Sequence, residues 1–146
     1  MEWGYVIGLF SVALCVLLCG IGSALGLSKT GQAAAGVLSE EPKRFSKVLV
    51  LVVLPATQGI YGFVFGIVAS SSCVLGMSIS AGLSLLLASL PLTITGLLTP
   101  ILQGKTASSC IYAVSKKESL SGRLILFPAM IETYAILSLV ISLLLL

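Results

Sequence analysis

The sequence predicts an all-α membrane protein in which four transmembrane helices form two tandem parallel-repeat hairpins. Hydrophobic residues make up 58% of its 146 residues and charged residues only 9%, a composition typical of membrane proteins. Four long apolar segments follow one another, and none shows the alternation of period two that barrel strands require. Helices are therefore the expected spanning form, because a helix satisfies its own backbone hydrogen bonds in lipid.

The four apolar segments cover residues 5–38, 47–71, 75–114 and 121–146. At about 1.5 Å per residue, each is long enough to cross a hydrocarbon core of about 30 Å. Near the N-terminus a signal peptide would carry positive charge, whereas this chain has Glu2, and the apolar run that follows is too long for a signal peptide. We therefore expect the first segment to stay in the membrane.

Basic residues gather in two of the three links between the segments. The links at residues 39–47 and 115–123 are basic, whereas residues 70–78 carry no charge. The basic residues are Lys43, Arg44 and Lys47 in the first of these links, and Lys116, Lys117 and Arg123 in the other. The positive-inside rule therefore predicts a multi-pass protein of the cell membrane, with both basic links in the cytoplasm and both termini on the opposite side.

The chain repeats itself with an offset of 73 residues, which divides it into hairpins at residues 1–73 and 74–146. The segment LPATQGIYG aligns with FPAMIETYA. The residues kept by the repeat include Pro55 with Pro128 and Tyr61 with Tyr134. Glu132 instead falls on Gly59, so the first hairpin has no carboxylate of its own. If the carboxylate is the site, two hairpins share one site.

Small residues recur at helical spacing along the first and third segments. Gly22 and Gly26 form a GxxxG pair in the first segment. In the third segment the small residues are Gly76, Ser80, Ser84 and Ala88. Such faces let helices approach closely in a membrane. The pattern fits packing within the chain or an inner layer of helices from several copies, with the bulkier second and fourth segments facing lipid.

The last segment carries one carboxylate, Glu132, well inside its apolar run. A carboxylate at that depth costs about 2.5–3.5 kcal/mol even on the mildest insertion scale. A chain rarely keeps such a group without using it, so Glu132 is the predicted binding site for an ion or a proton. The alternative is a tolerated polar residue that faces other parts of the protein.

Few other polar residues lie inside the spans, and these are predicted to meet Glu132. One face of the second helix carries Leu54, Thr57, Gln58 and Tyr61. Gln103 follows Pro100 in the third helix, as Glu132 follows Pro128 in the fourth. Each proline frees the carbonyl four residues before it, so backbone oxygens are also available at this depth.

These residues offer a set of oxygens that favours a small hard cation over a lone proton. The oxygens come from the carboxylate of Glu132, the amides of Gln58 and Gln103, the hydroxyl of Thr57 and a carbonyl near Pro55. Hard cations bind several charged and neutral oxygens at once. Tyr61 is placed to donate a hydrogen bond to Glu132. The alternatives are a mutual hydrogen bond between the two amides and a packing role for Tyr61.

The remaining composition excludes several other functions. The chain has no His and no Asp, which excludes His-based metal sites and a Ser-His-Asp triad. It also lacks a nucleophile–base pair, a phosphate loop and a cofactor fingerprint, so we do not expect an enzyme. The net charge of +3 is too small to suggest nucleic acid. The four cysteines form no CxxC pair and are predicted to be small packing residues.

The duplicated hairpin, the LPATQGIYG segment and the PAMIETYAIL segment resemble the membrane rotor (proteolipid, c/K) subunits of V-type ATPases. The resemblance covers essentially the whole chain, and the oxygen set is similar to that of the bacterial sodium-translocating members. It implies Na⁺ ligands at Glu132, Gln103, Gln58, Thr57 and the backbone carbonyl of Leu54, with Tyr61 bonded to Glu132. It also implies a non-catalytic role, because other subunits hydrolyse ATP.

The same resemblance implies a homo-oligomeric ring of about ten copies in lipid, turned through central-stalk subunits that contact the basic links. An empty Glu132 carboxylate facing lipid is costly, whereas one paired with Na⁺ or H⁺ is nearly neutral and can pass through lipid. No Arg lies deep within a span, so a stator membrane subunit is expected to supply the arginine that meets the empty site.

Three alternatives stay open from the sequence. The same rotor would carry H⁺ if the amides were only structural. A small four-helix, proton-coupled secondary transporter would also use a membrane glutamate, but it needs an aromatic-lined cavity, and the only Trp here is terminal. A tetraspan scaffold would leave the buried oxygens without a use.

Overall fold

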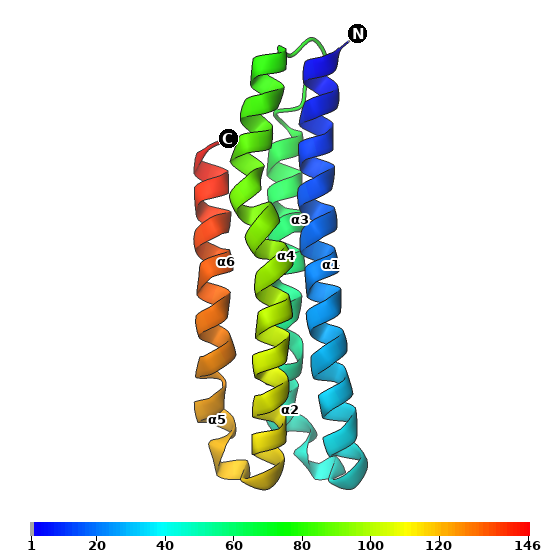
Figure 1. The fold of residues 1–146 in the computed structure, drawn as a ribbon, viewed down its shortest axis with the longest axis vertical. Helices are drawn as coiled ribbons and strands as arrows, with labels where there is room; N and C mark the ends of the chain where they lie inside the picture. The colour runs from blue at the N-terminus through cyan, green and yellow to red at the C-terminus, as the bar shows by residue number, and fades with distance from the viewer. Residues whose placement is uncertain (1) are drawn as a thin grey trace.

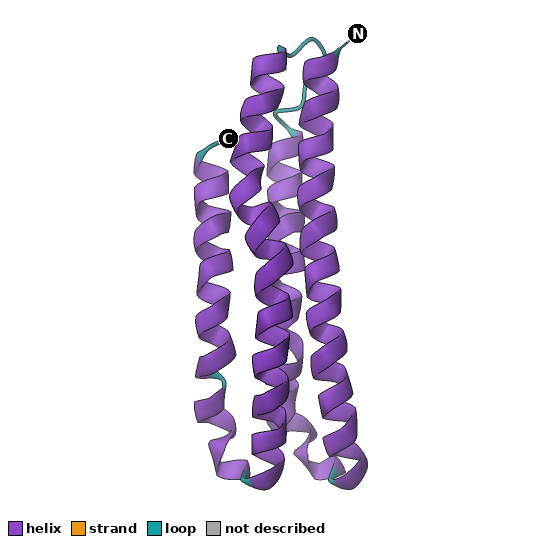
Figure 2. Cartoon of the chain, in the orientation of Figure 1, coloured by secondary structure: helices purple, strands orange, loops and turns teal. Residues whose placement is uncertain are grey.

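The computed structural model describes residues 2–146, which form helices joined by short loops, with no strand among them (Figure 2). In chain order the elements are α1 (Trp3–Glu40), η1 (Pro42–Arg44), α2 (Phe45–Val53), η2 (Leu54–Ala56), α3 (Thr57–Ser70), α4 (Ile79–Lys116), η3 (Glu118–Leu120), α5 (Ser121–Leu124) and α6 (Leu126–Leu144). Four helical segments, at residues 3–40, 42–70, 79–116 and 118–144, are long and apolar enough to cross a membrane. The predicted all-α fold with four spans is therefore confirmed.

The second and fourth spans are each interrupted near a proline. Pro55 lies in the 3₁₀ turn η2, between α2 and α3, and Pro128 follows the break between α5 and α6. Because Pro128 has no N–H, it leaves the Leu124 carbonyl without its helical donor. The Cys110 thiol lies 3.6 Å from that oxygen and donates to it. A side chain of α4 thus stabilises the break in the fourth span.

The third span begins four residues later than the sequence suggested, at Ile79 rather than residue 75. Gly76 adopts a φ of +83°, a left-handed conformation that only glycine enters readily. Ser78 then caps the helix, because its Oγ accepts a hydrogen bond from the Ala81 N–H at 3.2 Å. Gly76 therefore belongs to the turn, and the small-residue face of this helix starts at Ser80.

Close contact between α1 and α4, which run side by side in Figure 1, forms the centre of the chain. A Cβ on Gly22 would lie only 2.6 Å from the Gly96 carbonyl oxygen, and one on Gly26 would collide with the Pro100 carbonyl. The GxxxG pair thus brings two backbones into contact within one chain. By contrast, a Cβ on Gly31 would meet nothing within 4 Å.

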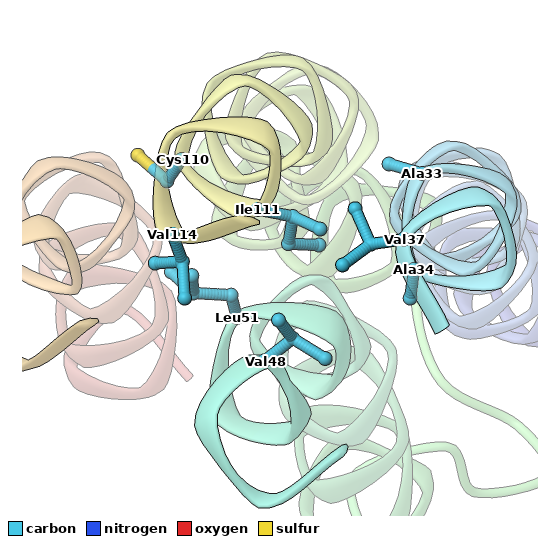
Figure 3. Packing of buried hydrophobic residues seen from close by; sticks show 8 residues of the cluster. All are labelled: Ala33, Ala34, Val37, Val48, Leu51, Cys110, Ile111 and Val114. Carbon is cyan, nitrogen blue, oxygen red and sulfur yellow. The ribbon is translucent and has the colours of Figure 1, made fainter. Parts of the chain in front are cut away.

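A buried apolar cluster fills the space between α1, α2 and α4 near the two basic links (Figure 3). Its members are Ala33, Ala34 and Val37 from α1, Val48 and Leu51 from α2, and Cys110, Ile111 and Val114 from α4. In Figure 3 the sulfur of Cys110 points away from the α1 side of this cluster. A second cluster, which includes Cys15, Cys19 and Phe65, packs α1 against α3 and α4.

The two basic links lie at the same end of the molecule, and both termini lie toward the other end (Figure 1). Arg44 ties the first link to the last turn of α4, because its guanidinium donates to the Val114 carbonyl at 2.8 Å, and it also pairs with Glu41. The same guanidinium holds the pKa of the Glu41 carboxyl below its usual value. Lys47 and Glu118 lie 3.6 Å apart and bring the two links into contact with each other.

We predict that Gly26→Ala lowers the thermal stability of the protein in detergent. The added Cβ would lie against the Pro100 carbonyl and 2.7 Å from the Pro55 side chain, so α1 and α4 must separate. Overpacking of this kind typically costs about 1–3 kcal/mol. Circular dichroism during heating measures the effect. Gly122→Ala is the control, because a Cβ at Gly122 would meet nothing within 4 Å; equal melting temperatures for the two variants would contradict the prediction.

Candidate functional site

Two glutamines from different helices meet in the interior of the bundle. Gln58 belongs to the first turn of α3 and Gln103 to α4, and neither side chain is exposed. The Gln58 Nε2 donates a hydrogen bond to the Gln103 Oε1 at 2.9 Å. The structure therefore brings together two amides that are 45 residues apart in the sequence.

Glu132 extends from α6 toward these amides and is only partly buried. Its Oε1 accepts a hydrogen bond from the Tyr61 hydroxyl of α3 at 2.6 Å. Its Oε2 lies 3.5 Å from the Gln103 Nε2, at the outer limit of a hydrogen bond. The Gln103 Nε2 donates more strongly to the Pro128 carbonyl, at 3.0 Å. Side chains from α3, α4 and α6 thus form one connected polar group.

Thr57 and Leu54 lie beside this group but are bonded to each other. The Thr57 hydroxyl donates to the Leu54 carbonyl at 2.9 Å, across the 3₁₀ turn that Pro55 creates. No hydrogen bond joins either residue to Glu132 among the described residues. The Leu54 carbonyl also accepts the Thr57 N–H, whereas the Thr57 hydroxyl oxygen keeps its lone pairs and is available as an acceptor near the first turn of α3.

The Gln58 Oε1 is the unusual atom of the site. It is buried and finds no hydrogen-bond donor in residues 2–146. Such atoms are rare in folded proteins, because a buried acceptor without a donor loses its solvation and gains nothing in return. Together with the partly satisfied Glu132 Oε2, it leaves an excess of oxygen acceptors at one place in the bundle.

An excess of oxygens around a single carboxylate can bind a small cation or a proton. The described residues contain no group of three or more His, Cys, Asp or Glu side chains. Neutral amide, hydroxyl and carbonyl oxygens must therefore supply most of any coordination. Hard monovalent and divalent cations accept such ligands, whereas softer metals prefer nitrogen or sulfur.

Sequence reasoning missed three groups that support the site. Thr30, fully buried on α1, donates to the Val52 carbonyl at 2.8 Å beside the Pro55 break. The Pro128 carbonyl accepts from Gln103, and the Ser23 hydroxyl accepts from the Gly59 N–H at 2.7 Å. The repeat was the available signal for Thr30, because an offset of 73 residues places it on Gln103.

Fold and site together define a class of protein: a membrane ion carrier built from a duplicated helical hairpin, with one carboxylate among neutral oxygens. A family model that describes the C subunit of ATP synthase matches residues 10–69 and, a second time, residues 75–145. The chain therefore belongs to this ATP synthase family of C subunits. This membership confirms the resemblance that the sequence indicated.

Two relatives match over almost the whole chain. The first is the V-type sodium ATPase subunit K of Enterococcus hirae, which is 44% identical over 142 residues, covering 97% of this chain and 91% of the relative. The second is the A-type ATP synthase subunit K of Methanocaldococcus jannaschii, which is 34% identical over 148 residues. That match covers 97% of this chain and 62% of the relative.

The family places the chain among the non-catalytic membrane subunits of rotary ATPases, in which other subunits hydrolyse ATP. Its members assemble into rings in the membrane. The prediction that the chain is not an enzyme is thus confirmed by its family. Membership of this family rules out the two other classes that the sequence left open, a small secondary transporter and a non-transporting scaffold.

We predict that the losses of stability caused by Gln58→Leu and Gln103→Leu do not add in the double variant. Gln103→Leu alone leaves the Gln58 Nε2 buried without an acceptor, which costs about 1–3 kcal/mol. The double variant removes both buried amides, so that particular penalty disappears. Thermal unfolding of the two single variants and the double variant in detergent measures the coupling. Additive losses would show that the amide–amide hydrogen bond does not form.

Proposed function

We propose that the chain is the ion-carrying component of a V-type rotor ring and that Glu132 carries Na⁺ across the membrane as the ring turns. The observation that carries this proposal is the buried Gln58 Oε1, which lacks a donor. Its amide is bonded to Gln103, whose Nε2 lies 3.5 Å from the Glu132 carboxylate. A cation next to both groups would satisfy the amide oxygen and neutralise the carboxylate together. A proton on Glu132 would supply a single O–H donor, whereas a cation binds several oxygens at once.

The proposed Na⁺ ligands are the oxygens of Glu132, Gln103, Gln58 and Thr57 and the backbone carbonyl of Leu54. Tyr61 would hold the carboxylate in place through its 2.6 Å hydrogen bond. This donor set mixes one charged ligand with several neutral ones, as hard cations require. The 44% identity to a V-type sodium ATPase subunit K supports Na⁺ as the ion.

Transport follows from the charge of the site. With Na⁺ bound, Glu132 carries no net charge and the loaded copy is able to face lipid; without it, the carboxylate needs a cationic partner. Both arginines of the chain, Arg44 and Arg123, lie in the basic links at the ends of their helical segments, far along the chain from Glu132 and its partners. We therefore assign the partner to an arginine of a stator membrane subunit.

The proposed assembly is a closed ring, because hairpins that present the same surface close on themselves by rotation. A ring of about ten copies is what the resemblance to V-type rotor subunits implies. The basic links 39–47 and 115–123 would face the cytoplasm and contact the central stalk. The contacts of Arg44 with Val114 and of Lys47 with Glu118 would hold the two links in fixed positions where the stalk binds. Both termini would lie on the opposite side of the membrane.

Glu132→Gln is expected to abolish Na⁺ binding and transport while the ring still assembles. The amide keeps the size of the side chain and its contact with Tyr61 but removes the charge that a cation needs. Uptake of ²²Na⁺ into vesicles measures transport, and the mass of the detergent-solubilised ring measures assembly. Transport at the rate of the unchanged protein would refute the role of Glu132.

The ion itself is tested by carbodiimide, which labels protonated carboxyl groups. Millimolar Na⁺ should protect Glu132 from labelling in the isolated ring, since bound Na⁺ displaces the proton. Gln58→Leu removes the oxygen without a donor and should weaken this protection by about tenfold or more, which corresponds to about 1.4 kcal/mol. Equal labelling with and without Na⁺ in the unchanged ring would instead indicate a proton rotor.

Single cysteines test the orientation of the links. In a Cys73→Ser background, Ser119→Cys in the exposed link should react with a membrane-impermeant maleimide only in inverted vesicles. Ser72→Cys, in the exposed turn at the other end, should react only in intact cells. The reverse pattern would place the basic links outside the cytoplasm.

A further inference from the structure

The internal repeat creates a second copy of the site, in which nearly every ligand has been replaced. An offset of 73 residues carries Leu54, Thr57, Gln58 and Tyr61 to Phe127, Met130, Ile131 and Tyr134, and it carries Gln103 and Glu132 back to Thr30 and Gly59. The acid, both amides and the α3 hydroxyl are lost. Among these six side chains, the tyrosine alone is retained.

Tyr134 has no partner within its own chain. It is 64% exposed, and it lies on the same face of α6 as Phe127 and Met130, which are 59% and 63% exposed. Residues 2–146 offer its hydroxyl no acceptor. Two residues from Glu132, this hydroxyl lies deep in the span, where an unpaired polar group costs several kcal/mol. A neighbouring molecule must therefore cover this face and supply a hydrogen bond.

The replaced site on α1 and α3 has polar groups that are nearly all satisfied. Thr30 donates to the Val52 carbonyl at 2.8 Å, and Ser23 accepts from the Gly59 N–H at 2.7 Å. The Ser23 hydroxyl proton and its second lone pair have no partner among the described residues. Residue 59 is glycine, and the Ser23 side chain packs against it, since a Cβ at Gly59 would lie only 3.2 Å from the Ser23 Oγ.

Packing within the chain shows how the two faces fit together. The α3 helix contacts both α4 and α6, and from there Tyr61 reaches Glu132. Since α1 and α3 are the repeat equivalents of α4 and α6, the next contact around a ring places α6 of one copy on α1 and α3 of its neighbour. In that contact Tyr134 occupies the position equivalent to Tyr61, and Gly59 occupies the position equivalent to Glu132.

We propose that Tyr134 of one copy packs over Gly59 of the next copy and bonds to the Ser23 hydroxyl beside it, forming a cation-free contact between copies. This inference rests on the assembly of the chain into a ring. The contact is apolar apart from one hydroxyl pair, because Met130 and Ile131 replace the ligands Thr57 and Gln58. Around the ring, ion sites within chains therefore alternate with contacts between chains that bind no ion.

A photoreactive amino acid tests the contact. Benzoylphenylalanine in place of Tyr134, in the intact ring, should crosslink to residues near Ser23 and Gly59 of another copy, as mass spectrometry of the digested product would show. The matched control is the same residue at Thr133, one position away. Its repeat equivalent Ile60 is 57% exposed, so position 133 should crosslink to lipid. Crosslinks from position 134 to lipid alone, or to another part of the neighbour, would overturn the inference.

A double-mutant cycle tests the hydrogen bond. Tyr134→Phe and Ser23→Ala should each lower the temperature at which the ring dissociates, and the double variant should dissociate no earlier than the less stable single variant. Tyr61→Phe with Ser23→Ala is the control pair and should be additive, because Tyr61 bonds to Glu132 instead. Additive effects for Tyr134 and Ser23 would overturn the proposed bond.

Carbodiimide labelling of the same preparations separates this inference from the proposed function. Tyr134→Phe should leave the protection of Glu132 by Na⁺ unchanged, because Tyr134 is not part of the ion site. Loss of protection in that variant would show that Tyr134 takes part in Na⁺ binding, which would overturn the proposed cation-free contact. Absence of protection in the unchanged ring would contradict the Na⁺ proposal and leave the crosslinking result standing.

Discussion

A carboxylate inside a membrane must always have its charge balanced, and this requirement organises the polar part of the chain. Glu132 lies in an otherwise apolar helix, so every compensating group has to come from other helices or from a bound ion. Tyr61 supplies a hydroxyl, and Gln103 supplies an amide that also holds the Pro128 carbonyl. The buried Gln58 Oε1 then provides an acceptor that only a cation or a donor from outside could satisfy.

The close contact of α1 and α4 makes this arrangement possible. Glycines let the two backbones touch, so the bulkier helices α3 and α6 can pack on either side of a narrow centre. The proline breaks at Pro55 and Pro128 lie beside that centre, where Thr30 and Cys110 of α1 and α4 donate to carbonyls near them. The fold thus supports irregular backbone at membrane depth only where side chains of the protein satisfy it.

Duplication followed by loss explains why the repeat carries one membrane carboxylate and not two. The first hairpin keeps the shape of the repeat, including its proline and tyrosine, but has glycine where the second has the acid. Without a carboxylate, amide ligands at that level would be buried polar groups with no ion to bind, and apolar residues are more favourable there. Tyr134 finds no acceptor for its hydroxyl in residues 2–146, which is the basis of the proposed contact with a neighbouring copy.

The sequence by itself determined the four spans, and it predicted the repeat and the candidate site residues, because hydropathy, spacing and a lone membrane acid depend only on local chemistry. It misplaced the start of the third helix, since the turn at Gly76 depends on a positive φ that apolar composition does not reveal. Only the tertiary structure decided which oxygens pair with each other. Hydrogen bonds such as Gln58 to Gln103 join residues on different helices, and their geometry is set by how closely those helices pack.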